Sequence, residues 1–102
     1  MTEPSLILPA AEVTFGFPVY AVEYSPAASI IWVAGGGGPA KSGVRNSIVA
    51  LKYLGNGLVQ QLSTLSLGME APTSMAIDPN NERVLACGVN DRCWIIESED
   101  EA

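Results

Sequence analysis

The feature that most constrains the fold of this chain is an internal repeat. In each copy, a turn that contains a proline is followed by a short apolar segment, a small residue and a glycine. Pro79 lies 53 positions after Pro26, and Gly88 lies 53 positions after Gly35. An offset that is kept across turn, strand and glycine indicates two copies of one structural unit.

The repeated unit is predicted to be a set of short β-strands. One alternating segment precedes each turn, an apolar segment lies between turn and glycine, and a third segment follows the glycine, at 47–53 in the first copy and 93–97 in the second. Short alternating segments between Pro, Asn, Asp and Gly residues favour strands over helices.

A fourth strand is predicted at the end of the first copy. The turn Gly55-Asn56-Gly57 leads into residues 58–67, which would form an outer strand. Leu58, Leu62 and Leu65 also fit one face of a helix, so the helical alternative stays open from sequence.

The predicted fold is all-β, an antiparallel β-propeller (WD-repeat-like) fragment with one blade plus most of a second, because a period near 50 with several strands per unit is typical of propeller blades. The expected parts are an N-terminal segment 1–16 that could serve as an outer closing strand, a first blade 17–68, a partial second blade 69–97 and an acidic tail 98–102. A propeller needs at least four blades. We therefore expect a fragment, a truncated gene product, or a piece that depends on a partner.

Composition excludes some classes of function. Hydrophobic residues make up 48% of the chain and charged residues 16%, which suits a globular core. The net charge of -6 argues against binding to nucleic acid. No stretch approaches the roughly 20 apolar residues of a membrane-spanning helix, and the N-terminus lacks the basic start of a secretory signal. A soluble, cytosolic protein is predicted.

Residues suited to catalysis or metal binding are few. The chain has no histidine, and two cysteines do not make a structural zinc site. Cys87 and Cys93 bracket a short turn, so a cross-strand disulfide is conceivable in an oxidising compartment, but reduced, packed thiols are favoured without an export signal. Trp32 and Trp94 occupy corresponding strands and are expected in the core.

The first copy contains an overlong glycine-rich loop, Gly35 to Asn46. From Gly35 to the next strand there are twelve positions, against five from Gly88 in the second copy. Repeat proteins often place insertions on the binding face, and consecutive glycines let main-chain groups converge on a ligand or partner. The alternative is a flexible surface hairpin without a ligand. Val44, an aliphatic residue next to the cation Arg45, favours an interface contact.

A phosphate-binding loop is a second alternative for this segment. Gly35-x4-Ala40-Lys41-Ser42 approaches the pattern G-x-x-x-x-G-K-[ST] and follows an apolar strand. The second glycine is replaced by Ala40, and no convincing helix follows. Nucleotide hydrolysis is therefore disfavoured.

The glycine-rich segment and its surroundings resemble the N-terminal blades of the Sec-twelve/PREB family, which are endoplasmic-reticulum guanine nucleotide exchange factors for the Sar-type small GTPase that starts COPII coat assembly. The resemblance covers roughly residues 15 to 97. It rests on these segments: Phe17-Pro18-Val19-Tyr20-Ala21, Val33-Ala34-Gly35-Gly36-Gly37-Gly38, Lys41-Ser42-Gly43-Val44-Arg45-Asn46, Ala71-Pro72-Thr73-Ser74-Met75-Ala76 and Ala86-Cys87-Gly88.

This resemblance implies a seven-bladed propeller at the cytosolic face of the endoplasmic reticulum, and a GTPase regulator rather than an enzyme. The loop would hold a potassium ion, with Gly43 and Asn46 as its ligands, and would press against the GTPase. Asn46 would be the critical polar residue and Val44 the hydrophobic contact, with Lys41 and Arg45 also touching the partner. The alternative function is a non-catalytic β-propeller interaction module.

Overall fold

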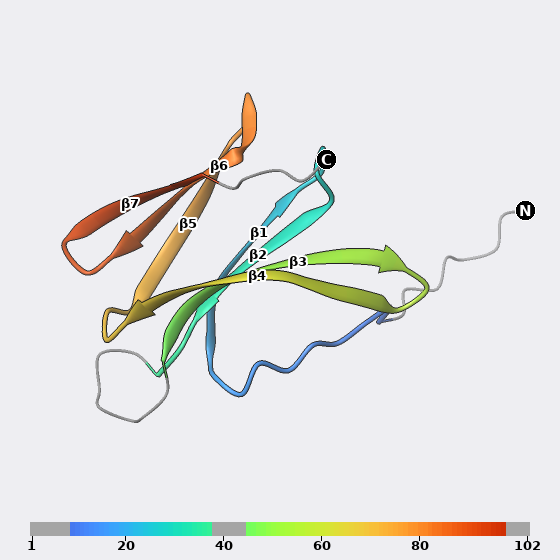
Figure 1. Ribbon diagram of the computed structural model, residues 1–102, viewed down its shortest axis with the longest axis horizontal. Helices are drawn as coiled ribbons and strands as arrows, with labels where there is room; N and C mark the ends of the chain where they lie inside the picture. The colour runs from blue at the N-terminus through green and yellow to red at the C-terminus, as the bar shows by residue number, and fades with distance from the viewer. Residues whose placement is uncertain (1–8, 38–44, 98–102) are drawn as a thin grey trace, which may run out of the picture.

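The computed structural model describes residues 9–37 and 45–97, and this part of the chain is all-β, as predicted (Figure 1). Seven strands form two antiparallel sheets with no helix among the described residues, and hence none that could span a membrane. The first sheet has the order β1-β2-β3-β4 and the second β5-β6-β7. The strands are β1 Val19–Ser25, β2 Ile30–Gly35, β3 Asn46–Gly55, β4 Leu58–Gly68, β5 Pro72–Asp78, β6 Asn81–Val89 and β7 Arg92–Glu97.

The segment after Gly57 is a strand, so the helical alternative is wrong. β4 pairs with β3 along its whole length, with Gly55 opposite Leu58 across a two-residue turn. Asn56 and Gly57 both have positive φ, 55° and 79°. A turn of this kind matches the twist of paired strands, and Asn-Gly is its preferred sequence. The hairpin therefore fixes β4 locally.

The strand pairing supports the sequence alignment of the two copies. Gly35 lies opposite Ser47 on β3, and Gly88 lies opposite Cys93 on β7. In the second copy the chain turns back at once, since Val89 already pairs with Arg92. In the first copy the long connection 36–45 begins at the same register. The third strand of each copy lies where it was predicted. In the structure β3 and β7 are each longer than the predicted segments 47–53 and 93–97.

The two sheets pack against each other through one shared apolar core. Trp32 and Ala34 of β2 lie in the same buried cluster as Leu85 and Cys87 of β6. These residues correspond under the 53-residue offset, so equivalent faces of the two copies meet. Burying each large side chain in such a core contributes about 1.5–3 kcal/mol. Strand β5 runs beside β1 at the junction of the sheets (Figure 1), and the sheets do not close on themselves within the described residues.

The opposite face of the first sheet is covered by the segment that precedes β1. Val33, Val49 and Leu51 form a second buried cluster, and Phe15 and Phe17 pack against it. The two phenylalanine rings lie 5.4 Å apart between centroids. No strand is assigned within residues 9–16, and residues 1–8 lie outside the described part. The segment thus covers this face with aromatic side chains.

A polar contact also joins the sheets. The hydroxyl of Ser25, which is fully buried, donates to Oε1 of Glu82 over 2.7 Å, and the main-chain N–H of Ala27 donates to the same oxygen over 2.8 Å. Glu82 is thereby held at the β1–β2 turn, 55 residues from Ala27 in the sequence. Two donors on one carboxylate oxygen are a strong arrangement.

Both cysteines are free, but their environments differ. Cys87 is buried in the shared core, whereas Cys93 is exposed. Cys93 lies opposite Gly88, one position beyond Cys87, so the two side chains point to opposite faces of the sheet. The expectation of packed thiols is confirmed for Cys87 and wrong for Cys93. Trp32 is buried and Trp94 packs against the core, as predicted.

Candidate functional site

The candidate site is the connection between β2 and β3, and its described root lies where four strand ends meet. Gly35, at the end of β2, pairs with Val19 at the start of β1 and with Ser47 in β3. Asn46, which opens β3, pairs with Gly68 at the end of β4. The connection therefore leaves and re-enters the sheet at paired positions, beside a register shift between Val19 and Ala21 in the β1–β2 ladder and another between Asn46 and Ser47 in the β3–β4 ladder.

The first two glycines of the run are required by close backbone approach. A Cβ at Gly35 would overlap the main-chain oxygen of Pro18, and a Cβ at Gly36 would overlap Asn46. Gly36 also has a φ of +146°, which side chains rarely adopt, and its N–H donates to the oxygen of Pro18 over 3.0 Å. Gly35 and Gly36 thus fix the exit of the connection from β2.

Asn46 fixes the return of the connection into β3. Its side chain is only 1% exposed, and its amide nitrogen donates to the main-chain oxygen of Gly68 over 3.0 Å. A buried amide that lacked a partner would be costly, so this hydrogen bond makes the burial of Asn46 tolerable. In this arrangement Asn46 positions the loop, because its side chain does not reach the surface.

The structure places two of the five predicted site residues. Asn46 is buried and Arg45, its neighbour in the chain, is exposed. The other three, Lys41, Gly43 and Val44, lie outside the described residues. Across 9–37 and 45–97, no group of three or more His, Cys, Asp or Glu side chains is arranged to hold a metal ion.

Sequence reasoning missed the residues that flank the loop root. Gly68 has a φ of +67° and ends β4, and the next residue, Met69, is 58% exposed. Glu70 then forms an ion pair with Arg92 and accepts a hydrogen bond from Asn90 over 3.5 Å. The glycine signals a turn after β4, but no sequence signal joins Glu70 to Arg92, because the pair forms only when the sheets are built.

One pKa shift concerns a residue on another element. Burial in the core, with a smaller effect from Cys93, raises the pKa of the Cys87 thiol. Cys87 lies in the middle of the shared core. The thiol is therefore kept neutral and does not serve as a nucleophile at the loop.

The fold and the loop root together define a class of protein with two packed antiparallel sheets and one extended, glycine-rich β2–β3 connection. No protein-family model, no curated protein and no solved structure matches this chain.

Proposed function

We propose that this chain is a guanine nucleotide exchange factor, or a fragment of one, for a Sar-type small GTPase in COPII vesicle formation, and that it acts through the Gly35–Asn46 loop. The proposal starts from the resemblance to the Sec-twelve/PREB family. The observation that supports it is the fixed root: Gly36 is bonded to Pro18 and Asn46 to Gly68. A loop held at both ends loses less conformational entropy on docking.

The proposed fold is part of a β-propeller. Strands β1–β4 form a four-stranded antiparallel meander, which is the composition of one blade, and β5–β7 supply three strands of a second. Blades in a ring pack opposite faces against each other, whereas here equivalent faces share a core. Assembly into a ring would therefore exchange this contact for contacts with further blades.

In this proposal some residues of the loop contact the GTPase and others hold the loop in shape. Val44 supplies the hydrophobic contact, and Lys41 and Arg45 supply cationic contacts to the GTPase. A potassium ion held by the Gly43 carbonyl and Asn46 would stiffen the segment. Exchange requires no bond-making, because preferential binding to the nucleotide-free GTPase weakens its nucleotide affinity by linkage. The site of action would be the cytosolic face of the endoplasmic reticulum.

The test is the rate of release of a fluorescent GDP analogue from a purified Sar-type GTPase, in potassium and in sodium buffer. The wild-type chain should accelerate release, and Val44→Asp should lower that acceleration at least about tenfold, because a buried charge weakens the docked state. Val22→Asp is the matched control, since Val22 lies in β1 and is 56% exposed. Absence of any acceleration by the wild-type chain would rule out the exchange function.

The second candidate is a non-catalytic interaction module. It is favoured by large apolar side chains on the outer faces of both sheets: Tyr24 is 55% exposed and Ile95 is 68% exposed. Exposed apolar surface of this kind marks sites of protein contact. Binding of the GTPase without any change in nucleotide release would assign this second function.

A further inference from the structure

We propose that the cleft between the two sheets binds a small amphipathic carboxylic acid, with its carboxylate held by Trp32 and Lys52. This ligand site is separate from the β2–β3 connection and belongs to the arrangement in which the two sheets share a core.

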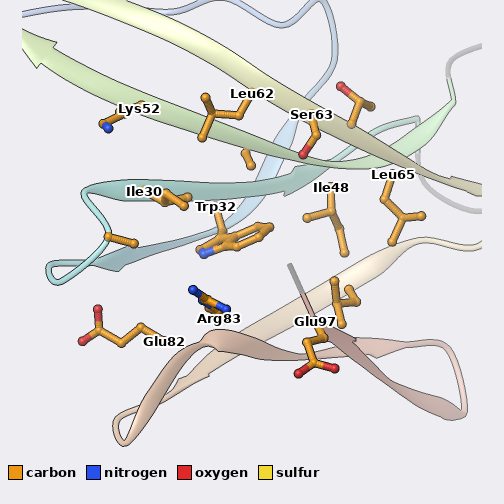
Figure 2. Close-up of a pocket in the computed structure, with 14 residues that line it drawn as sticks. Ile30, Trp32, Ile48, Lys52, Leu62, Ser63, Leu65, Glu82, Arg83 and Glu97 are labelled. Atoms are coloured by element: carbon orange, nitrogen blue, oxygen red, sulfur yellow. The ribbon is translucent and has the colours of Figure 1, made fainter. Parts of the chain in front are cut away.

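The cleft has the size and the lining of a small-molecule site. Its volume is about 660 Å³, within the range of roughly 300–1,000 Å³ that is usual for ligand pockets. Its walls are mainly apolar and come from both sheets (Figure 2). The isoleucine and leucine side chains of the lining are Ile30, Ile48, Leu62, Leu65 and Ile96. Such walls suit a hydrocarbon body.

Trp32 presents a hydrogen-bond donor without an acceptor. The residue is 5% exposed, and its indole Nε1 is buried with no hydrogen-bond partner among the described residues. Figure 2 shows this nitrogen on the side of the ring that faces Glu82 and Arg83. Because an unmet buried donor is costly, an acceptor brought by a ligand would be stabilised here.

Lys52 places a positive charge on the wall of the cleft that also carries this donor. Trp32 pairs with Ala50, and Ile30 pairs with Lys52, so Trp32 and Lys52 are diagonal neighbours on the same face of β2 and β3. Diagonal neighbours are about 7–8 Å apart, within reach of long side chains. Lys52 makes no hydrogen bond or ion pair within the described part of the chain. Trp32 and Lys52 can only donate, so the group they share must be an acceptor.

The acidic residues of the lining do not cancel this preference. Glu82 already accepts two hydrogen bonds on one oxygen, from Ser25 and Ala27, so its charge is stabilised within the protein. Glu97 is exposed to solvent, where its charge is screened. A ligand with an anionic head beside Lys52 and an apolar body along the isoleucines and leucines would complement both the positive charge and the apolar walls of the cleft.

The binding test uses decanoate as the probe and the Trp94→Phe variant, in which Trp32 is the only tryptophan. We expect saturable decanoate binding that changes the fluorescence of Trp32, and at least tenfold weaker binding of decanol, which has the same chain without the carboxylate. No saturable binding of decanoate, or equal affinity for the two ligands, would overturn the proposal.

The residue test compares two cations. Lys52→Met should weaken decanoate binding about tenfold, since a charge-assisted hydrogen bond is lost. Arg92→Met removes the same charge from a residue that pairs with Glu70 and does not line the cleft, and it should leave the affinity unchanged. Trp32→Phe, measured by calorimetry, should also weaken binding. Lys52 is only half-buried, so its variant decides the matter even if Trp32→Phe does not fold. Equal affinities of the Lys52→Met and Arg92→Met variants would contradict the assignment.

Discussion

Asn46 donates a hydrogen bond from its side-chain amide to the main-chain oxygen of Gly68, and this 3.0 Å contact ties the start of β3 to the end of β4. The residue that resemblance implicates in partner binding is therefore part of the sheet framework. Apart from the proposed potassium contact, its effect on the function of the loop passes through the position of the residues before it.

Replacing Asn46 should destabilise the fold as well as the loop. Asn46→Ala removes the donor to Gly68 from a buried site, and we expect a loss of about 1–3 kcal/mol in the free energy of unfolding. Urea denaturation measures the change. Gln60→Ala is the control, because Gln60 carries an amide on the exposed surface of β4 and should change stability by less than about 0.5 kcal/mol. Equal effects of the two variants would refute the anchoring role.

The two equivalent glycines should respond differently to alanine. At Gly35 the new Cβ would overlap the main-chain oxygen of Pro18, which cannot move without disturbing β1, so we expect a loss of about 2 kcal/mol or more. At Gly88 the nearest atom is the Ser74 hydroxyl at 3.0 Å, which can rotate away. Gly88→Ala should therefore cost less than half as much. Thermal unfolding of both variants compares them, and a larger loss for Gly88→Ala would contradict the close approach at Gly35.

Because the two sheets share a core, a destabilising substitution in one sheet should also destabilise the other. Leu85 is fully buried, and Leu85→Ala should cost about 2–5 kcal/mol. Hydrogen exchange should show lower protection in both β2 and β6, because Leu85 and Trp32 lie in one cluster. Leu58→Ala serves as the control, since Leu58 is 60% exposed. Loss of protection confined to β5–β7 would mean that the sheets unfold independently.

The two thiols should differ in reactivity towards iodoacetamide. Cys93 is exposed and should be alkylated rapidly in the native state. Cys87 should react only slowly, because it is buried and its raised pKa lowers the thiolate fraction at any given pH. Mass spectrometry of partly labelled protein identifies the modified residue, with urea-unfolded protein as the control in which both react. Faster labelling of Cys87 would show that the core is open.

The raised pKa of Cys87 also predicts how the stability of the fold changes at high pH. A raised thiol pKa means that the folded state holds the Cys87 proton more tightly than the unfolded state. The stability that comes from this difference is complete below the ordinary pKa of 9.0 and is lost as the pH rises towards the pKa of the folded state. Cys87→Ser has no thiol at this position, and its stability should fall less steeply above that pH.

Most of the secondary structure could be predicted because local signals agree. The alternating segments, the Asn56-Gly57 turn and the constant offset of the glycines each indicate the strands that the structure contains. Trp32 was expected in the core because it and Trp94 occupy corresponding strands, and it is buried there. The sequence could not say which faces meet, since either face of a short apolar strand can be covered, and both faces of β2 are in fact buried.

The candidate site was less accessible to sequence reasoning. The overlong connection is visible from the spacing of Gly35 and Ser47, but the burial of Asn46 depends on Gly68, which lies 22 residues away. The Glu82 contact with Ser25 spans 57 residues and has no local signal. Trp32 was correctly expected in the core, yet its unmet donor becomes visible only once both walls of the cleft are in place.

The aromatic segment before β1 sets a practical boundary for shortened versions of this protein. A version that started at Val19 would retain all seven strands and every ladder between them. It would nevertheless expose Val33, Val49 and Leu51 to water, because Phe15 and Phe17 pack against that cluster. The smallest unit that keeps this apolar face covered thus begins several residues upstream of the first ladder.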